Sequence, residues 1–419
     1  MSDLRADVLI VGGGPAGCAA GIALAGLGRS VVVVERPESD GHAPPGEILP
    51  PSAHRALHRL TTVPGSRDHA PCHGVRSAWG SPRVAAYDFL RLPYGRGWRI
   101  DRRALEHDLR ARLVESGARL LSAPRLRVLD RPSKGGAGRD RRCGVGTAAD
   151  AEWRVELLDH ARAPAPVDAR WVVDASGRAR VVARAAGARA HALDRLVAAT
   201  WVVAPPGGAA DAGDPLVESV PDGWWVSSLT PAGRLAVARF TDADLPSFRS
   251  GRRGDLDDAP RTAARVRARR LEKPARIWSA RSERLDDIAG PGWCAAGDAA
   301  AAHDPLCGNG ITYGLETGWR AARAVHAALD GDAAALERYA ASVRASFDRY
   351  LEGRDRWYAA ERRWPGAAFW RRRHEGRAGA RAGQLPAAAS GCASRSNAGS
   401  PRRRSQAGSS LSSAGVRDR

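Results

Sequence analysis

The chain has 419 residues, 43% of them hydrophobic, and a formal net charge of +19 at pH 7. The length fits one large or two ordinary domains, and the hydrophobic share is enough to fill a core. So positive a charge is typical of proteins that bind nucleic acid or anionic membranes. However, residues 371–419 contain 11 Arg and only two acidic residues, Glu375 and Asp418, which is a net charge of 11 − 2 = +9. Because about half of the excess lies in this tail, we expect no nucleic-acid partner.

The first 36 residues have the pattern of a strand, a glycine-rich turn, a helix and a second strand. Residues 7–11 are an apolar run typical of a buried parallel strand, residues 15–27 predict a helix of small side chains, and residues 31–34 predict the next strand. The apolar run at 8–28 could imitate a membrane span, but the residues before it lack a positive net charge and it is rich in glycine. We therefore predict no membrane span.

A GxGxxG motif, formed by Gly12, Gly14 and Gly17, joins the predicted first strand to the helix, and Glu35 follows Gly14 by 21 positions (35 − 14). Gly12 permits the tight turn, Gly14 lets a diphosphate approach the backbone, and Gly17 lets the helix pack on the strand. Glu35 is placed to accept hydrogen bonds from the adenosine ribose of a dinucleotide. The predicted binding residues of this turn are Gly12, Gly14, Pro15, Ala16, Gly17, Glu35 and Arg36, the last of which could stack on adenine or only be solvated.

The rest of the chain alternates strand and helix patterns. Further strands are predicted at residues 119–128, 153–157, 171–174, 197–203, 223–228, 235–240, 276–280 and 293–296, and helices at residues 102–116, 310–329 and 333–350. The β-rich middle of the chain implies a second domain inserted into the first, and residues 133–150 predict a surface loop. After Trp370 the composition changes to Arg, Ser, Gly and Ala, which predicts disorder.

Residues 292–318, GWCAAGDAAAAHDPLCGNGITYGLETG, resemble the GD motif of flavin monooxygenases, halogenases and geranylgeranyl reductases, which have the glutathione-reductase-type FAD fold. The resemblance implies that Gly297 lets the chain approach the ribityl group of FAD and that Asp298 accepts a hydrogen bond from a ribityl hydroxyl. It also implies that five residues carry the backbone past the isoalloxazine ring, Pro305, Gly308, Asn309, Gly310 and Ile311. The dipole of the helix that starts there would favour an anionic reduced flavin.

Three more segments resemble tryptophan-halogenase-like flavoproteins. GEILPPSA at residues 46–53 is similar to their GESLPP segment, WRIDRRALEHDL at 98–109 to their DR helix, and VVDASGRARVVAR at 172–184 to their DxSG segment, with Asp174 at a strand end. By this resemblance Arg102 contacts the cofactor phosphates or adenosine, although an exposed helical arginine is an open alternative. Residues 223–245 resemble the sheet over the flavin in halogenase-like monooxygenases and in flavoproteins that oxygenate protein tryptophan for quinone cofactors.

The resemblance implies an α/β protein with a doubly wound, parallel-sheet FAD domain and an inserted β-sheet substrate domain. The expected FAD domain comprises residues 1–80, 101–185 and, with the C-terminal helices, 281–370; the substrate domain comprises 81–100 and 186–280, and the disordered basic tail 371–419. Six cysteines without a CxxC pair favour reduced thiols and a cytoplasmic location. No His/Cys cluster has the spacing of a metal site.

The implied activity is that of an FAD-dependent monooxygenase that uses a flavin C4a-hydroperoxide to hydroxylate an aromatic or other electron-rich substrate, a small molecule or a tryptophan-containing protein. Because no second GxGxxG follows a strand, electrons are expected from docked NAD(P)H or from a separate flavin reductase. Glu47, Trp225 and His303 are the candidate site-lining residues. Glu47 would orient substrate or flavin, Trp225 would stack on an aromatic substrate, and His303 would donate to the flavin edge; each has an ordinary packing or surface alternative.

Two departures from the halogenases weigh against halogenation. Halogenases use a lysine near the substrate, whereas Lys134 and Lys273 are the only lysines here and neither lies between Glu47 and Arg102. The GWWVSSLTP sequence is also not the halogenase WxWxIP signature. A halogenase, a reductase of the geranylgeranyl-reductase type and a non-catalytic or degenerate flavoprotein remain as alternatives.

Overall fold

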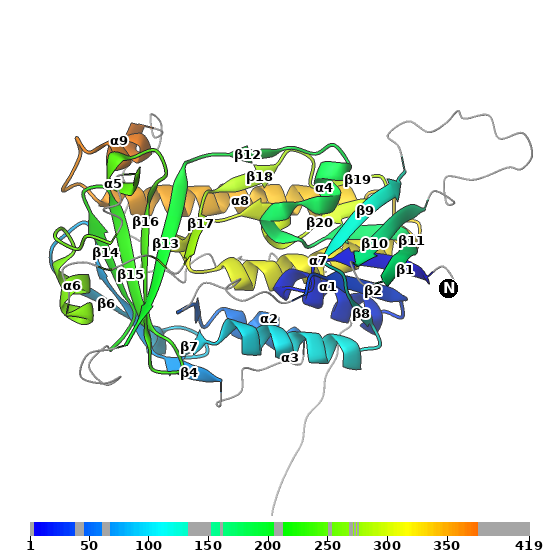
Figure 1. The fold of residues 1–419 in the computed structure, drawn as a ribbon, viewed down its shortest axis with the longest axis horizontal. Coiled ribbons are helices and arrows are strands. Elements are labelled where there is room, and N and C mark those ends of the chain that lie inside the picture. The colour runs from blue at the N-terminus through cyan, green and yellow to red at the C-terminus, as the bar shows by residue number, and fades with distance from the viewer. Residues whose placement is uncertain are drawn as a thin grey trace, which may run out of the picture.

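The computed structural model describes residues 4–37, 46–60, 68–132, 152–159, 162–204, 213–249, 254–267, 271, 274 and 276–375. A sheet lies at each end of the molecule, and long helices run between the two sheets (Figure 1). This arrangement confirms the predicted α/β fold with a parallel-sheet dinucleotide-binding part. The predicted loop at 133–150 and residues 376–419 of the predicted tail lie outside the described residues.

The first sheet is parallel at its centre because its strands are apolar on both faces and are joined through helices. β1 pairs in parallel with both β2 and β11, and Val8, Leu9 and Ile10 have no exposed surface. The strand order is β19-β20-β11-β1-β2-β8, and β10 and β9 extend β11 in an antiparallel arrangement. The strands are β1 Leu4–Val11, β2 Val31–Glu35, β8 Arg119–Ser122, β9 Arg125–Asp130, β10 Trp153–Asp159, β11 Arg162–Asp174, β19 Ala289–Gly290 and β20 Trp293–Ala295.

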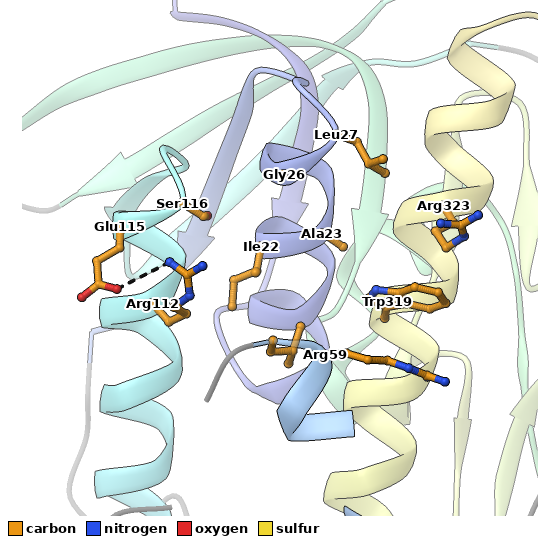
Figure 2. Close-up of a pocket in the computed structure, with 11 residues that line it drawn as sticks. Ile22, Ala23, Gly26, Leu27, Arg59, Arg112, Glu115, Ser116, Trp319 and Arg323 are labelled. Atoms are coloured by element: carbon orange, nitrogen blue, oxygen red, sulfur yellow. Dashed lines mark ion pairs between the residues drawn. The ribbon is translucent and has the colours of Figure 1, made fainter. Parts of the chain in front are cut away.

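Three helices form a layer beside this sheet, with α1 between α3 and α7 (Figure 2). They are α1 Pro15–Gly26, α3 Arg102–Glu115 and α7 Gly310–Leu329. The small residues of α1 permit this close packing, because a Cβ on Gly21 would lie 2.4 Å from Leu113 Cδ1. Asp101 caps α3, its carboxylate accepting from the backbone N–H groups of Arg103 and Ala104.

The second sheet has seven strands in the order β17-β13-β16-β15-β14-β5-β6. They are β5 Gly74–Ala78, β6 Ala85–Asp88, β13 Leu196–Val203, β14 Leu216–Val220, β15 Gly223–Leu229, β16 Leu235–Asp242 and β17 Arg276–Ser279. One face, with Trp201 and Trp225, packs against the segment that contains α6 (Pro260–Val266). The opposite face, with Trp224 and Phe240, packs against α8 (Ala335–Ala360) and α9 (Ala368–Glu375).

Smaller elements connect the two main parts. The short strands and helices are β3 Ile48–Leu49, α2 Ala53–Arg59, β4 His69–Cys72, β7 Gly97–Ile100, α4 Val181–Ala185, β12 Ala190–Ala192, α5 Pro246–Arg249, β18 Glu283–Leu285 and β21 Ala301–Ala302. β3, β7 and β4 form one small sheet, and β12, β18 and β21 form another. None of the described helices combines the length and the apolar character that crossing a membrane requires.

The predicted C-terminal boundary is wrong by several residues, because α9 continues to Glu375. Arg372 and Arg373 donate to Asp242, whose side chain is 2% exposed, and the Arg373 guanidinium lies 3.5 Å from the centroid of the Phe369 ring. Composition alone suggested solvated arginines, but Asp242 and Asp244, far away in the chain, neutralise these two. Residues 371–375 therefore belong to the folded protein.

Candidate functional site

A cavity of about 670 Å³ lies where the carboxyl ends of the parallel strands meet the starts of α1 and α7 and one side of α3. Ligands of open α/β sheets bind at such an edge. The structure brings together there most of the predicted residues from both halves of the chain. They are Gly12, Gly14, Pro15, Ala16, Glu35, Arg36, Glu47, Arg102, Gly297, Asp298, Gly310 and Ile311.

The glycine-rich turn has the geometry that a diphosphate site requires. Gly12 has a φ of +109°, and a Cβ on it would lie 2.3 Å from the Ala175 carbonyl oxygen. A Cβ on Gly17 would lie 1.7 Å from the Gly12 carbonyl oxygen, so the helix can pack here only without a side chain. A Cβ on Gly14, by contrast, would have no atom within 4 Å, because it would point into open space at the N-terminus of α1.

Glu35 lies at the end of β2, and its carboxylate accepts a hydrogen bond from the Gly13 N–H. Arg110 donates from Nε to the Gly13 carbonyl at 3.2 Å and also lines the cavity. The motif predicted Glu35 at this position. It did not predict Arg110, although the helical spacing from Arg102, two turns earlier, would put both side chains on one face of α3.

Glu47 and Arg102 form a pair at the cavity wall. Arg102 Nη1 lies 3.1 Å from both Glu47 carboxylate oxygens, and Arg102 Nε donates to Glu106 at 2.7 Å. Burial raises the pKa of Glu47, although Arg102 opposes that shift. The pair connects the segment at residues 46–53 to the DR helix. Both segments resemble parts of tryptophan-halogenase-like flavoproteins.

The GD segment is fixed by the DxSG segment. Arg180 is 2% exposed, has a φ of +50°, and donates to the backbone carbonyls of Asp298 at 3.3 Å and Ala299 at 3.2 Å. Glu283 neutralises it at 2.6 Å from Arg180 Nη1, and Arg178 Nε lies 3.8 Å from the Asp298 carboxylate. We refer to the pair of Arg180 and Glu283 as the arginine clamp. Sequence reasoning did not identify the clamp.

Asp174 has a structural part in this arrangement. It is fully buried at the end of β11, and its carboxylate accepts from Ser176 and from the backbone N–H groups of Val182 and Ala183. These contacts fix the turn from β11 into α4, with Gly177 at a φ of +64°. Ala175, Ser176 and Gly177 thereby line the cavity, and the sequence predicted none of the three as binding residues.

The loop before α7 is tied to the C-terminal helices through Asp304. This side chain is 1% exposed, and it accepts from Tyr358 Oη at 2.6 Å and from the Leu306 N–H at 2.9 Å. Tyr358 Oη in turn accepts from Trp224 Nε1 at 3.2 Å. Burial raises the pKa of Asp304 to about 6, although Tyr358 opposes the shift.

We predict that Asp304 makes folding stability depend on pH. Because its pKa is higher in the folded protein than the ordinary value of 3.8, the folded state binds more protons between about pH 4 and pH 6, so stability falls as pH rises through that window. The loss should be about 2 to 3 kcal/mol. Urea unfolding of wild type and Asp304→Asn should show wild type losing this amount relative to the variant between about pH 4 and pH 7, and parallel curves would contradict the assignment.

Trp225 and His303 do not line the cavity. Neighbouring residues on a strand point to opposite faces, and Trp225 is on the face away from α8 and α9, with its ring centroid 5.7 Å from that of Trp201. His303 lies between the rings of Tyr313 and Tyr350, at centroid distances of 4.2 and 4.1 Å, and burial lowers its pKa to about 3. Pro305, Gly308 and Asn309 lie in the loop and at the N-terminus of α7 but not among the lining residues.

The residues present fit a flavin dinucleotide. Gly14 leaves the turn at the start of α1 open on the cavity side. At the start of α7, Gly310 and Gly314 line the cavity without a side chain, so the backbone there is open to a ligand. Among the described residues no cluster of His, Cys, Asp and Glu is arranged to hold a metal ion.

Comparison with known proteins agrees with this site. Residues 5–205 match the family model of the FAD binding domain. LodB of Marinomonas mediterranea, named as an FAD-dependent oxidoreductase, is 25% identical over 379 residues, which is 88% of this chain and 96% of LodB. The protein is an FAD-dependent oxidoreductase. A menaquinone reductase of Mycobacterium tuberculosis is 28% identical over 344 residues, 76% of each chain.

Solved structures show the same fold. The myxobacterial chondrochloren halogenase CndH has a TM-score of 0.70 at 19% identity, covering 88% of this chain and 86% of CndH. The peptidyl tryptophan dihydroxylase QhpG, which is essential for tryptophylquinone cofactor biogenesis, has a TM-score of 0.64 at 23% identity, covering 88% of this chain and 78% of QhpG. These similarities confirm the predicted resemblance to flavin monooxygenases, halogenases and tryptophan-quinone maturation flavoproteins.

Proposed function

We propose that this enzyme is an FAD-dependent monooxygenase that hydroxylates an aromatic or other electron-rich substrate, with a tryptophan-containing substrate as the first candidate. One observation carries the proposal: the face of the seven-stranded sheet that bears Trp224 and Ala236 lies next to the part of the cavity lined by Glu47. A Cβ on Gly46 would lie 2.6 Å from Ala236 Cβ, and the adjoining Glu47 lines the cavity. A substrate bound over the flavin would therefore be enclosed between the cavity and this sheet.

The composition of that face supports an aromatic substrate. It combines small side chains at Ser228 and Ala236 with a stacked aromatic pair, Trp224 and Phe240, whose ring centroids are 3.9 Å apart. Trp224 and Phe240 are buried against α8 and α9, so a substrate ring would lie beside the small residues Ser228 and Ala236, next to Gly46. Trp224, rather than Trp225, is on this face of the sheet.

Bound FAD, once reduced, would supply the electrons that activate molecular oxygen. The residues of the chain would bind and orient the substrate and exclude water. Asp298 would hold the ribityl group, and the amide groups at the starts of α1 and α7 would meet the diphosphate and the ring edge. Glu47, held by Arg102, would bind the substrate or flavin through its carboxyl group. Electrons would come from NAD(P)H directly or from a separate flavin reductase, since the described structure contains one glycine-rich strand-turn-helix unit of this kind.

The similarity to a menaquinone reductase favours a second candidate, an FAD-dependent reductase, for which the sequence suggested the geranylgeranyl-reductase type. A reductase would convert its substrate without consuming oxygen. Oxygen uptake measured with an oxygen electrode, together with the product mass, distinguishes the two candidates, because hydroxylation adds one oxygen atom and reduction adds two hydrogen atoms.

We predict that turnover with reduced FAD and oxygen does not depend on halide. Trapping hypohalous acid requires a nucleophilic amine, and the segment from Glu47 to Arg102 contains no lysine. Arginine remains protonated and is a poor substitute. The rate of oxygenated product formation, or of hydrogen peroxide release without substrate, should be unchanged by chloride or bromide. A halogenated product, or a strict requirement for bromide, would contradict the monooxygenase proposal.

A further inference from the structure

A second hollow, of about 410 Å³, lies on the helical side of the FAD-binding part and shares no lining residue with the flavin cavity (Figure 2). Its floor is the last two turns of α1, with α3 on one side and α7 on the other. Ile22, Ala23 and Leu27 give the floor an apolar character, and Leu27 remains 37% exposed. Gly26 has no neighbouring atom within 4 Å of the position of a Cβ, so the floor is open.

The rim of this hollow holds two arginines against one tryptophan. Figure 2 shows Arg323 and Arg59 on opposite sides of the Trp319 ring, and their guanidinium carbons lie 5.0 and 4.9 Å from its centroid. Stacking uses the flat face of a guanidinium and leaves its N–H edge available for a carboxylate. Neither arginine forms an ion pair within the described part of the chain.

The acidic side chains near the hollow are already engaged by other arginines. Glu115 lies 3.6 Å from Arg112, and Glu316 lies 3.7 Å from Arg55. These contacts leave Arg59 and Arg323 as a fixed pair of positive charges beside an apolar floor. The charge complement of such a surface is a group of carboxylates next to apolar side chains.

Arg59 also lines a third hollow, again of about 410 Å³. There the His54 ring stacks on Tyr94 at a centroid distance of 5.0 Å, and Tyr94 is 57% exposed. The two hollows share Arg59 and no other lining residue, so together they form a surface longer than a small ligand needs. An extended segment of a protein, with one apolar side chain for each hollow, matches this shape.

We propose that the surface formed by these two hollows and Arg59, called here the arginine groove, binds an acidic segment of a partner protein. Apolar side chains of the segment enter the two hollows, and its carboxylates pair with Arg59 and Arg323. The proposal concerns a surface outside the flavin cavity and does not depend on which oxidation the flavin performs.

The test measures binding of a fluorescein-labelled peptide of alternating glutamate and leucine to the FAD-loaded full chain by fluorescence anisotropy. The double variant Arg59→Glu/Arg323→Glu should weaken binding by roughly ten-fold or more. Arg349→Glu/Arg362→Glu is the matched control, because both residues are exposed and the charge change is the same; it should change binding by less than about two-fold. Flavin content should be the same in both variants, since none of the four residues lines the flavin cavity.

Two further measurements distinguish binding of a peptide in the arginine groove from simple anion binding. Leu27→Glu places a charge on the apolar floor and should weaken peptide binding as well, because the proposal requires an apolar anchor there. Inorganic pyrophosphate should compete poorly with the peptide. An equal loss in the control variant, no loss with Leu27→Glu, strong competition by pyrophosphate, or no binding by wild type would each overturn the proposal.

Discussion

Replacing Gly14 by Val is expected to abolish FAD binding and to leave the protein folded. The backbone at Gly14, with φ −77° and ψ −174°, is available to any residue, and a Cβ there would have no atom within 4 Å. The valine side chain would instead occupy the space at the start of α1 that the diphosphate needs. The purified variant should therefore lack flavin absorbance but unfold in urea much as the flavin-free wild type does.

Two other glycines in α1 provide the controls. Gly26→Val also adds a side chain in open space but outside the flavin cavity, so it should retain FAD. Gly17→Val would drive a side chain into the Gly12 carbonyl, 1.7 Å from its Cβ, and should fail to fold. Normal flavin content in the Gly14→Val variant would refute the assignment of this turn to the diphosphate.

Cutting the chain after Trp370 is expected to destabilise it by roughly 3 kcal/mol, because the cut removes Arg372 and Arg373 and leaves Asp242 as an unpaired buried carboxylate. Cutting after Glu375 keeps both pairs and should leave the free energy of unfolding and the flavin content unchanged. Urea unfolding of the two truncated chains measures the difference directly.

A double substitution separates the ion pairs from the loss of chain length. Arg372→Met/Arg373→Met in the full chain retains α9 but removes both charges that face Asp242, so it should reproduce most of the destabilisation of the shorter chain. If both truncated chains are equally stable, the arginine pairs contribute nothing and the folded protein ends before α9.

The sequence predicted the parts of the fold that depend on local patterns. The run at residues 7–11 and the small residues of 15–27 became β1 and α1 within a few residues, because apolar periodicity and the glycine turn act over short distances. β11 is longer than the predicted strand at 171–174. The prediction missed its first part because that part contains two prolines and lacks a strand-like pattern. α8 extends ten residues beyond the predicted end at 350, to Ala360.

The site was predictable where a motif carried it and not where distant side chains meet. Glu35 and Asp298 follow glycine motifs at fixed spacing, and both line the cavity. Arg180 lies 103 positions from Glu283, and no local pattern in the sequence relates them. The choice of Trp225 over Trp224 depended on which face of β15 packs against α8 and α9, and only the tertiary packing determines this.

The two residues of the arginine clamp precede and follow the stretch that supplies five of the seven strands of the second sheet, from β13 to β17. Because Arg180 precedes that stretch and Glu283 follows it, the two ends of the insertion are held together by a contact that belongs to the flavin site. Changes of length or sequence inside the insertion therefore need not move Asp298. Selection for a new substrate could therefore change the inserted strands while the residues that bind the flavin stay in place.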